Sequence, residues 1–229
     1  MSTYLRPTAA IAADVLLPGD PAVALSLAQE LLEKPLMANH SYGLWGYSGR
    51  TNTGRELTIQ ATGIGGPSAA AVLGELAAQG VRRAIAIGRC RALDPGLEAG
   101  TLAVATGAVG ADGMSRTLGI TPTPDPGLTT ALARHAQPAI SVTVLSVDSL
   151  GELRGSRDGA AVADLEAAAL LALAARLGLQ AAAGLVVAEP ASGEPDEEAT
   201  QRALTRLGVA ATVALAEAQA PASATPSPS

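Results

Sequence analysis

The stretch Ala61-Thr62-Gly63-Ile64-Gly65-Gly66-Pro67-Ser68 decides how the rest of the chain is interpreted. It follows a strand-like run, 57–61, and opens a helix-like run, 68–79. Its glycines permit a tight turn and close approach of the backbone to a ligand. Pro67 suits the first turn of a helix, where free N–H groups attract anions. The same residues also fit an ordinary strand-to-helix connection, and they match neither the Gly-x-Gly-x-x-Gly pattern nor a P-loop.

Length and composition are those of one α/β domain with a large core. The chain has 229 residues, of which 48% are hydrophobic and 16% are charged. That balance indicates much buried surface, some of it between subunits. The formal net charge of −6 argues against nucleic acid as the main partner.

The residues that bind metals or form disulfides are few. Cys90 is the single cysteine, which excludes an internal disulfide and a thiol-only metal site. His40 and His135 lie far apart and give no metal-ligand spacing, so we expect neither a metal nor a cofactor. Residues 1–7 lack the layout of a signal peptide, and no apolar run approaches the ~20 residues of a membrane span. These features predict a cytoplasmic protein that does not bind membranes.

Strand-like and helix-like runs alternate along the chain, which predicts a central sheet flanked by helices. We expect strands at 13–17, 57–61, 83–87, 102–109, 140–146 and 181–188. We expect helices at 22–32, 68–79, 128–136, 160–177 and 195–218. Loops are expected at 110–116, at the proline-rich 121–127 and at 150–159. The predicted organisation is a flexible N-terminus (1–12), one domain (13–219) and a disordered Pro/Ser/Ala-rich tail (220–229).

The segment 39–49 contains His40, Tyr42, Trp45 and Tyr47. An aromatic, glycine-rich loop of this kind is either the wall of a pocket or a contact between subunits. The subunit contact is favoured, because Tyr and Trp are enriched at interfaces.

Five short pieces, taken in order, resemble the nucleoside phosphorylase family of the hexameric purine nucleoside phosphorylase and uridine phosphorylase type. They are Leu-Pro-Gly-Asp-Pro (17–21), Thr-Gly-Ile-Gly-Gly-Pro-Ser (62–68), Gly-Arg-Cys-Arg-Ala-Leu (88–93), Ala-Thr-Gly-Ala-Val (105–109) with Asp-Gly (112–113), and Asp-Leu-Glu-Ala-Ala-Ala (164–169). The resemblance covers 13–218. It implies a single-domain three-layer α/β/α sandwich with a central mixed sheet and a homo-oligomer, either a dimer or a hexamer.

The resemblance also implies a reaction in which phosphate cleaves the N-glycosidic bond of a nucleoside. A carboxylate orients the ribose, arginines bind phosphate, and an acid near the base protonates the leaving group. Gly19 matches the glycine whose N–H meets phosphate, and Glu166 matches the ribose-binding glutamate. Glu189 falls near the position of the leaving-group acid, although it also fits an ordinary acid of a flexible loop. Thr62 and Gly63 belong to the matching glycine-rich piece.

Other positions depart from the family pattern. Val23 and Ala86 stand where two phosphate-binding arginines are expected. Leu150 replaces an aromatic residue and Leu165 replaces a methionine. The residues that read uracil, and a histidine near the start, have no counterpart. The replacements predict a more apolar pocket, in which Glu166 has a raised pKa and acts as an acid or base, although Glu166 also fits a helix residue that is capped or paired by a neighbour.

Arg89 and Arg91 are the candidates to replace the missing arginines. Arg89 follows Gly88 at the expected turn, but it also fits a surface arginine paired with an acid. Cys90 is a conceivable nucleophile and a better candidate for a small packing residue. Asp112 and Arg116 are expected to be structural.

These observations leave three hypotheses open. The first is a nucleoside-cleaving enzyme that uses phosphate or water, with Asp20 as the one candidate to hold the water. The second is a repurposed cyclase or isomerase that acts on a more apolar small molecule. The third is a non-catalytic binding protein that retains the fold.

Overall fold

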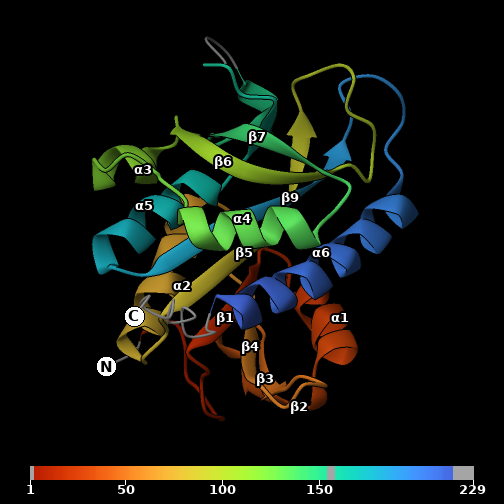
Figure 1. Ribbon diagram of the computed structural model, residues 1–229. Coiled ribbons are helices and arrows are strands. Elements are labelled where there is room, and N and C mark those ends of the chain that lie inside the picture. Colours follow the sequence, from red (N-terminus) through yellow and green to blue (C-terminus); the bar gives the residue numbers. More distant parts are fainter. Residues whose placement is uncertain (1–2, 154–157, 219–229) are drawn as a thin grey trace, which may run out of the picture.

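The computed structural model describes residues 3–153 and 158–218. Within them, a nine-stranded mixed sheet forms the centre of the molecule, in the order β2-β3-β4-β1-β5-β8-β7-β6-β9 (Figure 1). Its strands are β1 (Asp14–Pro18), β2 (Glu33–Asn39), β3 (Gly46–Arg50), β4 (Glu56–Gln60), β5 (Arg83–Ala92), β6 (Leu102–Gly110), β7 (Ala139–Ser146), β8 (Val162–Asp164) and β9 (Gln180–Glu189).

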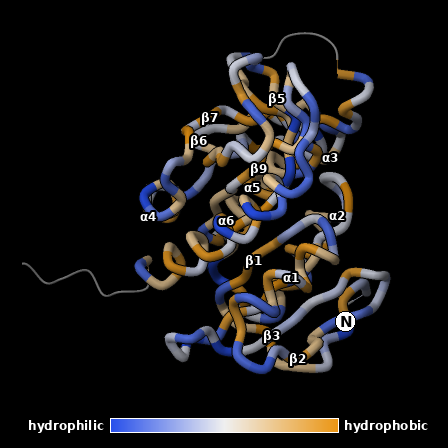
Figure 2. The backbone as a smooth tube through the Cα atoms, turned by 90° about the vertical axis from the view of Figure 1, so that its right-hand side faces the viewer, coloured by the Kyte–Doolittle hydropathy of each residue, from blue (hydrophilic) through white to orange (hydrophobic). Residues whose placement is uncertain are grey.

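Half of the sheet closes on itself. Strand β5 pairs in parallel with β1 and β9, and its far end pairs antiparallel with β8. Strand β9 also pairs antiparallel with β6, so β5, β8, β7, β6 and β9 form a ring. The antiparallel pair β2–β3 lies at one end of the molecule and β6 and β7 lie at the other (Figures 1 and 2). The long strand β5 belongs to this ring and also pairs with β1, so it lies in the middle of the fold.

Helices cover both faces of the sheet. They are α1 (Pro21–Leu31), α2 (Gly66–Ala78), α3 (Gly113–Leu118), α4 (Pro126–His135), α5 (Ala167–Leu177) and α6 (Glu197–Glu217). Apolar residues of α1, α4 and α6 pack in one core with Leu16 and Ile85, whereas α2 and α5 pack with Val15 and Ala84 in the other. Neighbouring strand residues thus point to opposite faces. This arrangement confirms the predicted three-layer sandwich with a mixed sheet.

The predicted helix 160–177 is wrong in its first half. Residues 162–164 form β8, which pairs with β5 and β7, and the helix begins only at Ala167. Glu166, with φ −147° and ψ −23°, stands at the break between the two elements. Strand pairing here overrides the helical preference of an alanine-rich run.

Other element bounds also differ from the expectation. Segment 39–49 contains the short 3₁₀ turn Ser41–Gly43 and the start of β3 rather than an irregular loop. Residues 88–91 continue β5, and α3 begins inside the expected loop 110–116 and runs past its end to Leu118. Helix α4 begins at Pro126, since a proline is tolerated in the first helical turn. A second short 3₁₀ turn spans Leu150–Glu152.

Residues 3–12 pack against the domain, in contrast to the flexibility expected for the segment 1–12, of which residues 1–2 lie outside the described ranges. Leu5 is buried in the core, and its N–H donates to the Glu75 carboxylate at 2.7 Å. Thr8 donates its N–H to the Ala38 carbonyl. These bonds order residues 3–12, while the predicted tail 220–229 lies outside the described residues. No described helix has the length and apolar character needed to cross a bilayer.

Candidate active site

A cavity of about 700 Å³ opens where several strands end. It brings together seven of the predicted site residues: Gly19, Asp20, Gly63, Arg89, Leu150, Leu165 and Glu166. These come from the β1–α1 turn, the β4–α2 turn, β5, the Leu150–Glu152 turn and the β8–α5 break. Thr62 lies just behind the wall, fully buried. Glu189 is not among the described residues that line the cavity.

Glu166 is half-buried and presents its carboxyl group to this cavity. The Thr62 hydroxyl donates to its Oε2 at 3.2 Å, and a Cβ atom added to Gly19 would lie 2.9 Å from its Oε1. The pKa of Glu166 is raised from 4.5 to about 8, chiefly by burial and also by the nearby Asp164 carboxylate, while the Thr62 hydrogen bond opposes both effects. The raised pKa predicted for Glu166 is therefore found, and its cause is desolvation.

The β1–α1 and β4–α2 turns are joined by backbone hydrogen bonds beside Glu166. The N–H of Gly63 donates to the Gly19 carbonyl at 3.0 Å. Gly63 and Gly65 have φ of 76° and 85°, a region that glycine adopts without strain. Ser68, in the first turn of α2, donates its hydroxyl to the Thr62 carbonyl and also lines the cavity. The glycine-rich stretch thus forms a wall of the cavity rather than a remote connection.

Asp164 is a site residue that the sequence reasoning missed. It lines the cavity from β8 and is almost completely buried. Its carboxylate accepts the Ser146 hydroxyl and the Ala167 N–H, the latter at 2.8 Å. Burial raises the pKa of Asp164 to about 6, against these two hydrogen bonds. The available signal was an acid two residues before Glu166, and it was hidden by the assumption of a continuous helix.

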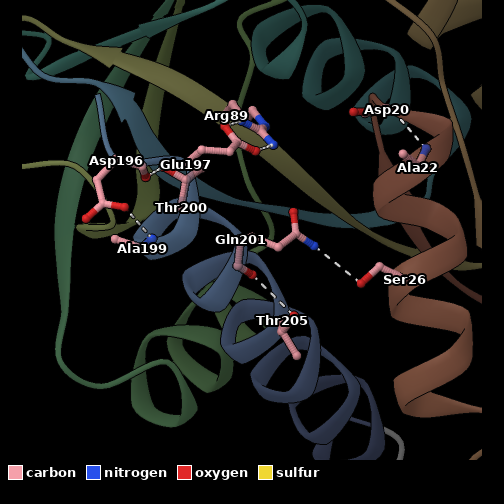
Figure 3. Close-up of polar contacts among 10 residues, drawn as sticks. All are labelled: Asp20, Ala22, Ser26, Arg89, Asp196, Glu197, Ala199, Thr200, Gln201 and Thr205. Atoms are coloured by element: carbon pink, nitrogen blue, oxygen red, sulfur yellow. Dashed lines mark hydrogen bonds and ion pairs between the residues drawn. The ribbon is translucent and has the colours of Figure 1, made fainter. Parts of the chain in front are cut away.

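Arg89 lies in the cavity wall but is already paired. Its Nη1 and Nη2 donate to the two carboxylate oxygens of Glu197 at 2.7 and 2.6 Å (Figure 3). This pairing raises the pKa of Arg89 and lowers that of Glu197. Arg89 therefore occupies the position expected of an anion-binding residue and also has the acidic partner that the alternative interpretation required.

Arg91 and Glu189 form a second ion pair away from the cavity lining. Arg91 donates to the Glu189 carboxylate and, at 2.6 Å, to the Leu150 carbonyl. The pair thus holds the backbone of a residue that does line the cavity. Neither side chain of the pair is itself in the described lining.

Apolar side chains form much of the remaining wall. Val23, Leu150 and Leu165 line it, as the family departures suggested, whereas Ala86 lies in the core behind it. Tyr42 adds an aromatic face to the same wall, so the loop 39–49 contributes to the pocket. Cys90 is buried, and burial raises the pKa of its thiol, which fits a packing residue.

The site can be compared with known proteins. Residues 14–219 match the family model described as the phosphorylase superfamily. The chain belongs to this superfamily. It is 29% identical over 220 residues to a DeoD-type purine nucleoside phosphorylase of Geobacillus kaustophilus, covering 90% of this chain and 93% of that protein. It is 31% identical over 208 residues to a guanosine phosphorylase of Halorubrum lacusprofundi, covering 82% and 85%.

A solved structure supports the fold of this superfamily member. Uridine phosphorylase from Vibrio fischeri superposes with a TM-score of 0.82 at 22% identity, covering 90% of this chain and 93% of that one. The recognised family and fold are therefore confirmed.

Proposed function

We propose that this chain is an enzyme that cleaves the N-glycosidic bond of a nucleoside or a related small molecule, with phosphate or water as the acceptor. The observation that carries the proposal is the carboxyl group of Glu166, which lines the cavity and accepts a hydrogen bond from Thr62. The relatives of this chain that are named purine nucleoside phosphorylase and guanosine phosphorylase support the same reaction class.

Glu166 is suited to bind a sugar. A carboxyl group with two accessible oxygens can pair with two neighbouring hydroxyls, and near neutral pH its raised pKa makes it both a donor and an acceptor. As the glycosidic bond breaks, the sugar gains positive charge, which favours the ionised carboxylate. The attraction is then stronger in the transition state than in the ground state, which is the condition for catalysis.

The leaving-group acid remains a prediction at Glu189. Its carboxylate shares Arg91 with the Leu150 carbonyl, so it lies one contact away from the cavity wall. Asp20, in the wall itself, remains the predicted residue to hold a water molecule, and its Oδ1 already accepts the Ala22 N–H.

One set of observations favours a second candidate function. The aliphatic wall at Val23, Leu150 and Leu165 suits a less polar small molecule, on which a repurposed family member could act as a cyclase or isomerase. A binding protein without catalysis is the remaining alternative. Both predict that no base is released from nucleosides.

The proposal is tested by incubating the protein with inosine, guanosine, uridine and methylthioadenosine, with and without phosphate, and measuring free base by chromatography. We expect release from at least one nucleoside. We also expect Glu166→Gln to lower the rate about 100-fold or more, because the carboxyl charge is lost where positive charge develops. The exposed Glu30 supplies the control, and Glu30→Gln should retain the wild-type rate. Release from none of the four would refute the proposal for these substrates.

We further propose that the chain forms a homo-oligomer, a dimer or a hexamer, and that it works in the cytoplasm. Tyr42 and Ile64 line the cavity and are exposed, and Trp45 is also exposed. Exposed apolar groups of this kind support an interface.

A further inference from the structure

The ion pair between Arg89 and Glu197 joins two distant parts of the chain at the cavity wall. Arg89 lies on β5, and Glu197 is the first residue of α6, 108 positions later. The Glu197 carboxylate accepts two short hydrogen bonds, from Nη1 and Nη2 of the Arg89 guanidinium (Figure 3). An external anion such as phosphate would bind a guanidinium through the same kind of two-donor contact.

Hydrogen bonds hold the start of α6 in place, and they thereby fix the position of Glu197 relative to Arg89. The Asp196 carboxylate caps the helix through the Ala199 N–H at 2.8 Å. The buried Thr200 donates its hydroxyl to the Asp196 carbonyl at 2.7 Å. Gln201 donates to the Ser26 hydroxyl on α1 at 3.3 Å (Figure 3).

The charges around the cavity make this contact important. Among its described lining residues, Arg89 is the only one with a basic side chain, whereas Asp20, Asp164 and Glu166 are acidic. Asp20 also interacts electrostatically with Arg89. With Glu197 in place, the positive charge of Arg89 is already balanced, and little attraction for a second anion is left.

We propose that Glu197 is a specificity-determining residue that competes with anionic acceptors for Arg89 and so weakens the binding of inorganic phosphate in this cavity. For turnover, the inference rests on the proposed function: Glu197 shifts the choice of acceptor from phosphate toward water.

The test is a calorimetric titration of inorganic phosphate into the wild-type protein, Glu197→Gln and Glu198→Gln. Glu198 is the matched control, because it lies in the same helical turn and carries the same charge but pairs with Arg202. We expect Glu197→Gln to lower the phosphate dissociation constant at least about fivefold. Glu198→Gln should change it less than about twofold, because its charge is screened from the cavity. Thermal melts establish that each variant is folded.

The double variant Arg89→Gln/Glu197→Gln identifies the group that binds the phosphate. The tighter binding should disappear in it, since the freed guanidinium is the source of the gain. The inference is overturned by equal effects of Glu197→Gln and Glu198→Gln, by a gain that survives Arg89→Gln, or by no measurable phosphate binding in Glu197→Gln.

Base release measured on the same proteins separates the two proposals. Tighter phosphate binding in Glu197→Gln without base release from any nucleoside would contradict the proposed function and leave this inference standing. Base release with unchanged phosphate binding would contradict the inference alone. If both hold, base release by Glu197→Gln should depend more strongly on added phosphate than base release by the wild-type protein.

Discussion

Gly19 and Glu166 lie so close together that the first residue determines where the carboxyl group of the second can sit. An alanine at position 19 would place its Cβ 2.9 Å from Glu166 Oε1. The atom it meets is the end of a flexible side chain, so the carboxyl group moves and the fold survives. We expect Gly19→Ala to lower base release at least about tenfold with little change in melting temperature.

Gly74 gives the control for this change. An added Cβ there meets nothing within 4 Å, and the residue lies in the middle of α2. Gly74→Ala should therefore stabilise the protein by about 0.5–1 kcal/mol and leave base release unchanged. Equal rates for Gly19→Ala and the wild-type protein would show that the position of Glu166 is not set by this contact.

The raised pKa of Glu166 also makes the stability of the protein depend on pH. Burial moves the pKa from 4.5 to about 8 on folding. Between these values the folded state holds a proton that the unfolded state releases, so the free energy of unfolding falls as pH rises. The contribution of this group to the free energy of unfolding is present in full below pH 4.5 and is lost between pH 4.5 and about 8. Within that window it changes by up to about 1.4 kcal/mol per pH unit.

Glu166→Gln removes this titration. We expect the variant to gain stability relative to the wild-type protein as the pH rises from 5 to 8, as measured by urea unfolding. Glu30→Gln, at an exposed position, should follow the wild-type curve. Parallel curves for Glu166→Gln and the wild-type protein would mean that Glu166 is ionised in the folded state.

At the scale of elements, Ser146 ties β7 to the β8–α5 break that carries the site. Its hydroxyl donates to Asp164 and accepts the Ala168 N–H at 2.9 Å. Ser146→Ala leaves both groups buried without this partner, and we expect a loss of about 1–3 kcal/mol in urea unfolding.

Ser115 is the matched control for Ser146. Its Oγ is also buried, but it makes no hydrogen bond within the described ranges 3–153 and 158–218. Ser115→Ala should thus be neutral or slightly stabilising. A similar loss for both variants would show that burial, rather than the Ser146 bonds, sets the cost.

Most elements could be predicted from the sequence because their signals are local. The runs 57–61 and 22–32 each specify a strand or a helix through the pattern of a few neighbouring residues. Residues 160–177 could not be assigned correctly, because β8 is a strand only through its pairing with β5 and β7. Local residue propensities do not indicate which strands will pair with one another.

The site was predictable to the same extent. Gly19 and Glu166 follow strand ends, and strand ends meet in α/β folds, so their presence in one cavity follows. Arg89 was expected at such an end but lies inside β5. The pairing of Arg89 with Glu197 could not be predicted in this way. Glu197 is 108 residues away, in an acidic segment that suits the helix dipole equally well.

At the scale of the whole molecule, the proposed oligomer makes a prediction about Tyr42 and Ile64. Both side chains are largely exposed, and a subunit contact there would bury them. We expect Tyr42→Glu or Ile64→Glu to shift the mass measured by light scattering toward the monomer, because a buried unpaired charge is unfavourable. Val209→Glu, at an exposed position on α6, should leave the mass unchanged. If neither Tyr42→Glu nor Ile64→Glu changes the measured mass, the interface lies elsewhere.

The half-closed sheet has a consequence for how copies of the protein can associate. Because β9 pairs with β5, the backbone N–H and C=O groups at that end of the sheet are occupied. Strand β2 is therefore the outermost strand of the described sheet. Strand β2 is a poor template for fibre-like growth: Lys34 has a φ of 48°, Pro35 has no N–H, and the pairing with β3 shifts register. We therefore expect the proposed oligomer to form through side-chain contacts rather than by addition of strands to the sheet edge.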